Sequence, residues 1–152
     1  MISKTVTRLV IHSTLTLILS TLWWPVLEAA AADVAVYKDA RCGCCAKWVE
    51  HLSRDGFQVT THNETSMDKI KFTHGVPAQL ASCHTAIVDG YVVEGHVPAD
   101  VLQRLLRERP RVKGIAVPGM PAGAPGMEGP RAQRYDIVSF DAQGKTALYE
   151  SR

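Results

Sequence analysis

Three of the four cysteines in this chain lie within four residues, at Cys42, Cys44 and Cys45. This spacing is too crowded for the scattered bridges of a disulfide-stapled fold. A short β-prone run ends just before them and a helical pattern begins at Ala46, so the cysteines are expected at a helix N-terminus. The free N–H groups and the helix dipole at such a position stabilise thiolate over thiol. This lowers the thiol pKa and makes the side chains better nucleophiles and metal ligands.

Two kinds of chemistry fit this cluster. Cys42 and Cys45 have the C-x-x-C spacing of dithiol redox enzymes. Cys44 is unnecessary for that chemistry and would offer a wrong disulfide partner. The third thiol therefore favours metal binding over dithiol exchange.

The elements that position these cysteines follow from the spacing of apolar residues. Gly56 and Pro110 end two amphipathic helices, and Asp89-Gly90 predicts a tight hairpin. The expected fold class is α/β and thioredoxin-like, with a β-α-β-α-β-β-α core, a loop rich in Gly, Pro and Met over residues 114–131, and a C-terminal β-hairpin. Strands are expected at 34–37, 57–61, 85–88, 91–94, 135–140 and 146–149, and helices at 46–55, 68–74 and 99–109.

A second pair of candidate ligands, Cys83 and His84, lies just before the strand expected at 85–88. In thioredoxin-like folds the residue before this strand is usually a cis-proline that faces the C-x-x-C turn. This chain has Ser82-Cys83-His84-Thr85 there, without a proline. In that fold Cys83, and with it His84, would come within coordination reach of the first three cysteines, so four sulfur atoms are expected to converge.

The residue types indicate which metal such a site would hold. Thiolates beside imidazole and thioether groups suit Cu(I) or Zn(II), and the sequence shows no carboxylate cluster of the kind that binds Ca, Mg or Mn. Zinc fingers generally use two well-separated chelating pairs. The close spacing of the first three cysteines instead favours bridging thiolates, more than one metal ion, and copper over zinc. Met120 and Met127 in the Gly/Pro loop are candidate further ligands by residue type.

The N-terminus and the charge balance indicate the compartment and the partners. Residues 1–31 have the basic start, apolar stretch and small-residue end of a signal peptide, which leaves residues 33–152 as a single exported domain with no membrane anchor. The chain has 17 Lys+Arg against 15 Asp+Glu and no basic run interleaved with aromatic residues, so nucleic acid is not an expected partner. In an oxidising compartment, four thiols must be paired, metal-bound or reactive.

The motifs around these residues resemble those of the CopG family of periplasmic copper-resistance proteins, which are thioredoxin-like. The resemblance covers nearly all of residues 33–150. It is carried by Cys42-Gly43-Cys44-Cys45-Ala46-Lys47-Trp48, Ser82-Cys83-His84-Thr85-Ala86, the stretch from Gly90 to Pro98, and Val117-Pro118-Gly119-Met120-Pro121.

This resemblance implies a periplasmic protein that binds copper(I) and acts in copper resistance or homeostasis. It implies that Cys42, Cys44, Cys45 and Cys83 are metal ligands, that His84 is a further ligand, and that Met120 is a better candidate than Met127. Some relatives carry another cysteine shortly before the Cys-His pair, where this chain has Thr73 and His74. The number of copper ions is therefore left open.

Two other functions are consistent with the same residues. In a thiol-disulfide oxidoreductase, Cys42 or Cys44 would attack a substrate disulfide and Cys45 would resolve the mixed disulfide. In a structural zinc module, folding would collapse on chelation. The sequence favours a metal-binding protein over an enzyme. It leaves open the redox chemistry of copper or thiols, a periplasmic copper donor or acceptor, and a homodimer formed through exposed thiols.

The histidines also have structural interpretations. His84 could donate a hydrogen bond to a ligand rather than bind metal itself. His96, at a strand-to-helix turn, is interpreted as a hydrogen-bonding structural residue rather than a ligand.

Overall fold

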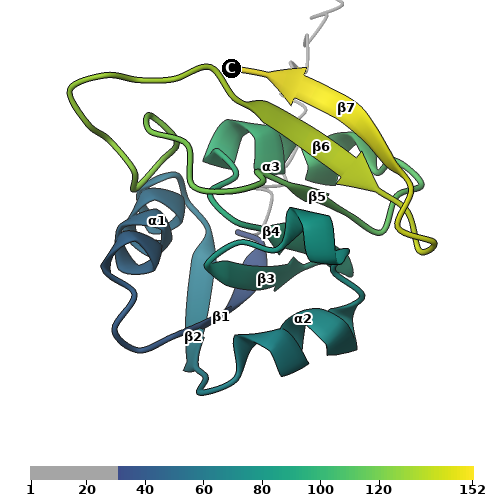
Figure 1. Cartoon of the computed structure of the whole chain (residues 1–152), viewed down its shortest axis with the longest axis horizontal. Helices are drawn as coiled ribbons and strands as arrows, with labels where there is room; N and C mark the ends of the chain where they lie inside the picture. Colours follow the sequence, from purple (N-terminus) through teal and green to yellow (C-terminus); the bar gives the residue numbers. More distant parts are fainter. Residues whose placement is uncertain (1–30) are drawn as a thin grey trace, which may run out of the picture.

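The computed structural model describes residues 31–152, which form one seven-stranded mixed sheet with three α-helices and a short 3-10 helix (Figure 1). The strand order is β2-β1-β3-β4-β5-β6-β7, so β2 and β7 are the two edges. The elements are β1 (Asp33–Lys38), α1 (Gly43–Arg54), β2 (Gln58–Asn63), α2 (Met67–His74), η1 (Ala78–Leu80), β3 (His84–Val88), β4 (Tyr91–Glu94), α3 (Ala99–Glu108), β5 (Gly114–Ala116), β6 (Asp136–Phe140) and β7 (Thr146–Ser151).

The sheet is mixed because its strands arrive by different connections. The α1 crossover makes β1 and β2 parallel, and the Asp89-Gly90 turn makes β3 and β4 an antiparallel hairpin. β1 pairs with β3 in antiparallel register, which places Lys38 opposite His84. The carboxyl end of β1, which leads to the cysteines, therefore lies beside the first residue of β3.

Side chains alternate between the two faces of the sheet and form two separate cores. On one face, Val93 and Ile115 pack with residues of α1 and α3, including Trp48 and Leu52. On the other face, the neighbouring residues Val92 and Ala116 form a smaller cluster with Leu80 of η1 and Phe140 of β6. The sheet thus separates the groups on the α1 and α3 side from those on the η1 side.

Trp48 holds α1 against the strand end that carries His84. Its side chain is fully buried, and its Nε1–H donates a hydrogen bond of 2.8 Å to the carbonyl of Val97. The indole ring lies over the His84 imidazole, with the ring centroids 4.2 Å apart. The helix that begins at the cysteines is therefore packed directly against the second group of candidate ligands.

The expected elements occur in the expected order, with two additions, the short helix η1 and the strand β5. The expected loop at 114–131 begins with strand β5, so the irregular segment starts after Ala116. All three residues of β5 are buried, and they pair in parallel with β4 and antiparallel with β6. Because of this strand, the C-terminal hairpin of β6 and β7 continues the main sheet (Figure 1).

The proposed signal peptide at 1–31 lies almost entirely outside the described residues. Within residues 31–152, no helix has the length and apolar character needed to cross a membrane.

Candidate metal centre

The first three cysteines lie at the N-terminus of α1, as the sequence predicts. Cys42 is the N-cap residue, and its Sγ accepts a hydrogen bond of 3.3 Å from the backbone N–H of Cys45. Cys45 is fully buried, whereas Cys42 and Cys44 are partly exposed. The local turn thus directs three sulfur atoms to one end of a helix whose dipole favours negative charge.

Two of these sulfurs are joined in the structure. Cys42 and Cys45 form a disulfide, while Cys44 and Cys83 are free. The Cys44 Sγ lies 3.5 Å from the Cys42 Sγ. The four sulfur atoms of Cys42, Cys44, Cys45 and Cys83 all lie within 4.8 Å of one another. This is the convergence expected from the sequence, and reduction of the disulfide would make four thiol groups available at one point.

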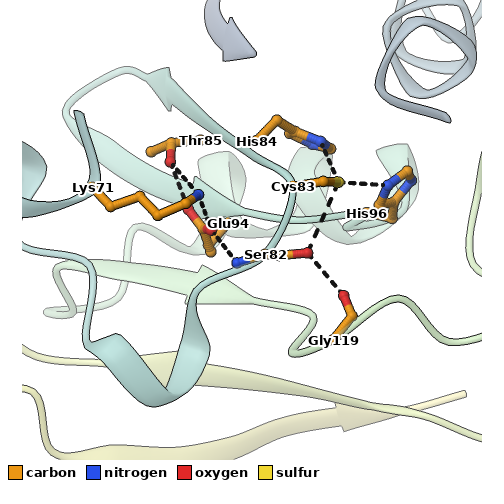
Figure 2. Close-up of polar contacts among 8 residues, drawn as sticks. All are labelled: Lys71, Ser82, Cys83, His84, Thr85, Glu94, His96 and Gly119. Atoms are coloured by element: carbon orange, nitrogen blue, oxygen red, sulfur yellow. Dashed lines mark hydrogen bonds and ion pairs between the residues drawn. The ribbon is translucent and has the colours of Figure 1, made fainter. Parts of the chain in front are cut away.

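Cys83 also belongs to a second group of candidate ligands. Its Sγ lies 3.3 Å from His84 Nδ1 and 3.1 Å from His96 Nε2 (Figure 2). Cys83, His84 and His96 offer one ligand atom each, and these atoms lie within 4.8 Å of one another. The two groups share the Cys83 sulfur, which gives it the position of a bridging atom.

The ring of His96 has a defined tautomer. Its Nδ1 lies 2.7 Å from the carbonyl oxygen of Pro125, which can only accept a hydrogen bond, so Nδ1 carries the proton. The lone pair is then on Nε2, the atom that faces Cys83. A backbone carbonyl that fixes the outer nitrogen of an imidazole is the usual support for a metal-binding histidine.

His84 is held as a neutral imidazole. Burial is the main cause that lowers its pKa well below the usual value, and the neighbouring His96 lowers it further. Burial also lowers the pKa of His96. Among the described residues, the fully buried His84 Nε2 has no hydrogen-bond partner. Neutral imidazole is the form that binds metals, and two such rings beside thiols fit a soft metal ion.

The Cys83 thiol is protonated in the metal-free protein. Burial raises its pKa to about 11, and the nearby Cys44 contributes to the increase. The lowered pKa predicted for the helix N-terminus concerns Cys42, Cys44 and Cys45, whereas Cys83 lies in a separate segment before β3. A metal ion at this sulfur would have to displace a proton.

This raised pKa predicts a slow reaction of Cys83 with iodoacetamide in the protein with its disulfide intact. Because only thiolate reacts, the rate is expected to increase about tenfold per pH unit between about pH 8 and pH 10. Mass spectrometry of the alkylated peptides would measure the rate, with Cys44 in the same sample as the reference thiol. A Cys83 rate that levels off below about pH 9 would contradict the raised pKa.

The structure places five of the seven candidate ligands in the two groups: Cys42, Cys44, Cys45, Cys83 and His84. Met127, in the Gly/Pro loop, is partly exposed, and its role as a ligand stays a prediction. Met120 is 55% exposed, and its role as a ligand also stays a prediction. His74, at the position where some relatives carry a further cysteine, lies near the ring of Tyr37, with the centroids 5.4 Å apart.

His96 is the candidate that sequence reasoning placed in a structural role. The expected hydrogen bond is present, to the Pro125 carbonyl, but the other ring nitrogen contacts Cys83. The one available signal was its place within the stretch from Gly90 to Pro98 that carries part of the family resemblance.

Comparisons with known proteins indicate the family to which the chain belongs. A family model described as a protein of unknown function, DUF411, matches residues 80–127. Two solved structures described as copper resistance protein CopG, Form 1 and Form 2, are each 45% identical, with a TM-score of 0.76. Each match covers 80% of this chain and 98% of the solved chain. No curated protein sequence gives a significant match.

The fold and the site define a mixed α/β protein with a cysteine cluster that could hold a metal ion at the junction of β1 and α1. The chain belongs to the CopG family of copper resistance proteins.

Proposed function

We propose that this protein binds copper(I) in the periplasm and acts in copper resistance and homeostasis. The ligands are the thiolates of Cys42, Cys44, Cys45 and Cys83, with His84, His96 and Met120 as further ligands. The observation that carries this proposal is the convergence of four sulfur atoms within 4.8 Å, from two segments far apart in the sequence. Thiolate sulfur is the ligand type that Cu(I) prefers.

The arrangement of the two ligand groups supports a site for more than one ion. Cys83 belongs to the four-cysteine group and also to the group with His84 and His96. A thiolate can bridge two copper ions, so one ion in each group would share this sulfur. In a structural zinc site, four ligands surround a single ion, so no sulfur has to be shared between two ions.

The proposed location in the periplasm follows from the expected export signal. The periplasm is oxidising, and thiolates that are bound to copper are protected from unwanted pairing. The two-segment site at the start of α1 and before β3 is the arrangement expected for a thioredoxin-like fold.

Copper would be exchanged with a periplasmic donor or acceptor protein through the partly exposed Cys44.

The disulfide supports a redox cycle as part of this function. In the reduced protein, Cys42 and Cys45 carry two thiols. Oxidation of these thiols forms the sulfur–sulfur bond and releases two protons and two electrons, and two Cu(II) ions that accept one electron each become two Cu(I) ions. The protein would then be returned to the dithiol form by an external thiol reductant.

The same disulfide favours a second candidate function, thiol-disulfide oxidoreduction. Cys42 and Cys45 form the bond that such an enzyme would use, and Cys44 lies 3.5 Å from one of its sulfurs. This function does not need Cys83 or the two buried histidines.

Metal loading of the reduced chain tests the proposal. The protein is reduced, loaded anaerobically with Cu(I) or Zn(II), and measured for metal per chain and for affinity against a competing chelator. We expect more than one copper ion per chain and tighter binding of copper than of zinc. A chain that retains no copper but catalyses disulfide exchange would show that the second candidate is correct.

A further inference from the structure

A buried ion pair lies behind the segment that carries Cys83. Lys71 Nζ of α2 is 2.6 Å from Glu94 Oε1 at the end of β4, and the Glu94 side chain is fully buried (Figure 2). Two charges lose their hydration when they are buried. A protein in which an apolar pair of similar volume replaces a buried ion pair is often at least as stable. Stability alone is therefore a weak reason for this pair, and its contacts indicate another role.

The Glu94 carboxylate joins three elements. Its Oε1 accepts hydrogen bonds of 2.6 Å from Lys71 Nζ and 2.6 Å from the backbone N–H of Ser82, and its Oε2 accepts one of 2.7 Å from the Thr85 hydroxyl. Lys71 also donates to the Thr85 hydroxyl, at 3.2 Å. One carboxylate thus fixes α2, β3 and the backbone of the residue immediately before Cys83.

The ion pair and the imidazole of His84 lie on opposite faces of the sheet. Thr85 and Glu94 are cross-strand partners in β3 and β4, so their side chains share a face. His84 precedes Thr85 on the same strand and therefore points to the other face, where it packs against Trp48. Glu94 can thus reach the candidate ligands through the backbone of residues 82–85, without contacting their side chains.

Further contacts hold this segment on its other side. The Ser82 hydroxyl donates a hydrogen bond of 2.8 Å to the carbonyl of Gly119, which precedes Met120 (Figure 2). Gly95 approaches so closely that an added Cβ would lie 2.8 Å from Ser82 Oγ and 2.6 Å from the Val117 carbonyl. Ser82 is therefore held between β4 and the Gly/Pro loop, and Cys83 follows directly from it.

We propose that Glu94, itself held by Lys71, is a positioning residue that fixes the Ser82 backbone and so keeps the Cys83 sulfur at the point shared by the two ligand groups. This role deepens the copper-binding function proposed above and rests on it. Its central prediction is that an acceptor at position 94 for the Ser82 N–H determines the position of Cys83, whether or not the acceptor is charged.

Two matched double variants isolate this hydrogen bond. Lys71→Met with Glu94→Gln removes both charges but keeps a carbonyl oxygen that can accept from Ser82. Lys71→Met with Glu94→Leu removes both charges and also the acceptor. Neither variant leaves a buried charge without a partner, so the comparison is not dominated by charge burial.

Two readouts are measured on the reduced proteins, and thermal melting establishes that the variants fold. The first is Cu(I) affinity in competition with a chelator. The second is the alkylation rate of Cys83 without metal, which a displaced, more accessible thiol would increase. We expect the Leu variant to bind Cu(I) about tenfold more weakly and to be alkylated several-fold faster, because a hydrogen bond to a buried acceptor is lost. The Gln variant is expected to stay within about twofold of the wild type.

A folded Leu variant with wild-type affinity and alkylation would overturn the proposal, and so would equal defects in both variants. If the Leu variant does not fold, Lys71→Met with Glu94→Met provides the test, because the unbranched Met side chain is close to Gln in shape but has no acceptor for the Ser82 N–H. A faster alkylation of Cys83 is then expected, and an unchanged rate would overturn the proposal. The alkylation readout needs no copper. If the wild type binds no copper, the proposed function fails and the positioning role is still tested.

Discussion

Replacement of Cys83 by serine is expected to cause the largest loss of copper binding of any single substitution. Cys83 is the one residue that belongs to both ligand groups, so Cys83→Ser removes the single sulfur that the two groups share. Loss of a residue that only supports a metal ligand weakens binding about 10–100-fold, so loss of this shared ligand is expected to weaken Cu(I) binding at least about a hundredfold. Copper per chain is also expected to decrease, as measured by metal analysis and chelator competition.

His62→Gln is the matched control for this substitution. His62 is an exposed residue of the edge strand β2, where its ring stacks on Tyr37 with the centroids 4.9 Å apart. It is outside both ligand groups but could bind copper adventitiously at the surface. We expect His62→Gln to leave affinity and stoichiometry unchanged. Wild-type affinity in Cys83→Ser, or equal losses in both variants, would show that the proposed centre is wrong.

The part of the site at the start of α1 is predictable because its signals are local. A β-prone run, a Cys-rich turn and a helical pattern follow one another along the chain, so the sequence indicates that the cysteines lie at a helix N-terminus. The Asp89-Gly90 hairpin is local in the same way. The approach of Cys83 to this turn is not a local property, and it could be predicted only through the expected fold.

The contacts that complete the site are distant in sequence and have no pattern of their own. His96 approaches Cys83 because β4 returns alongside β3 and the loop carbonyl of Pro125 orients its ring. The same return brings Glu94 to the Ser82 N–H. A single histidine or glutamate at the end of a strand has many structural explanations, so neither could be identified from composition or spacing.

Strand β5 shows the same limit for the fold. Its three residues, Gly114–Ala116, are too few to give a periodic signal, and glycine is unfavourable in strands. The strand forms because β4 and β6 pair with it on both sides. An added Cβ at Gly114 would lie 2.1 Å from the Val92 carbonyl, so the close pairing requires glycine there. Tertiary contacts, rather than local preference, determine this part of the sheet.

The redox state of the Cys42–Cys45 pair is expected to control copper binding. In the disulfide form, two of the four sulfurs no longer provide thiolates, and Cys44 and Cys83 are the free thiols. Copper binding by the four-cysteine group should therefore be at least about a hundredfold weaker than in the reduced protein. Loss of a residue that only supports a ligand already weakens metal binding about 10–100-fold, and here two ligands are lost. The Cys83, His84 and His96 group keeps all its ligands, so the oxidised protein should retain a smaller number of copper ions.

Anaerobic titration of the reduced protein with Cu(II) would measure this coupling directly. If the two thiols reduce copper, each disulfide formed should be accompanied by two Cu(I) ions, because the bond releases two electrons and each ion accepts one. Disulfide would be measured by mass spectrometry after alkylation, and Cu(I) by a chelator specific for that state. A Cys45→Ser control cannot form this disulfide and should yield less Cu(I). Equal copper affinity of the oxidised and reduced proteins would rule out control by this pair, because the disulfide would then leave the binding site intact.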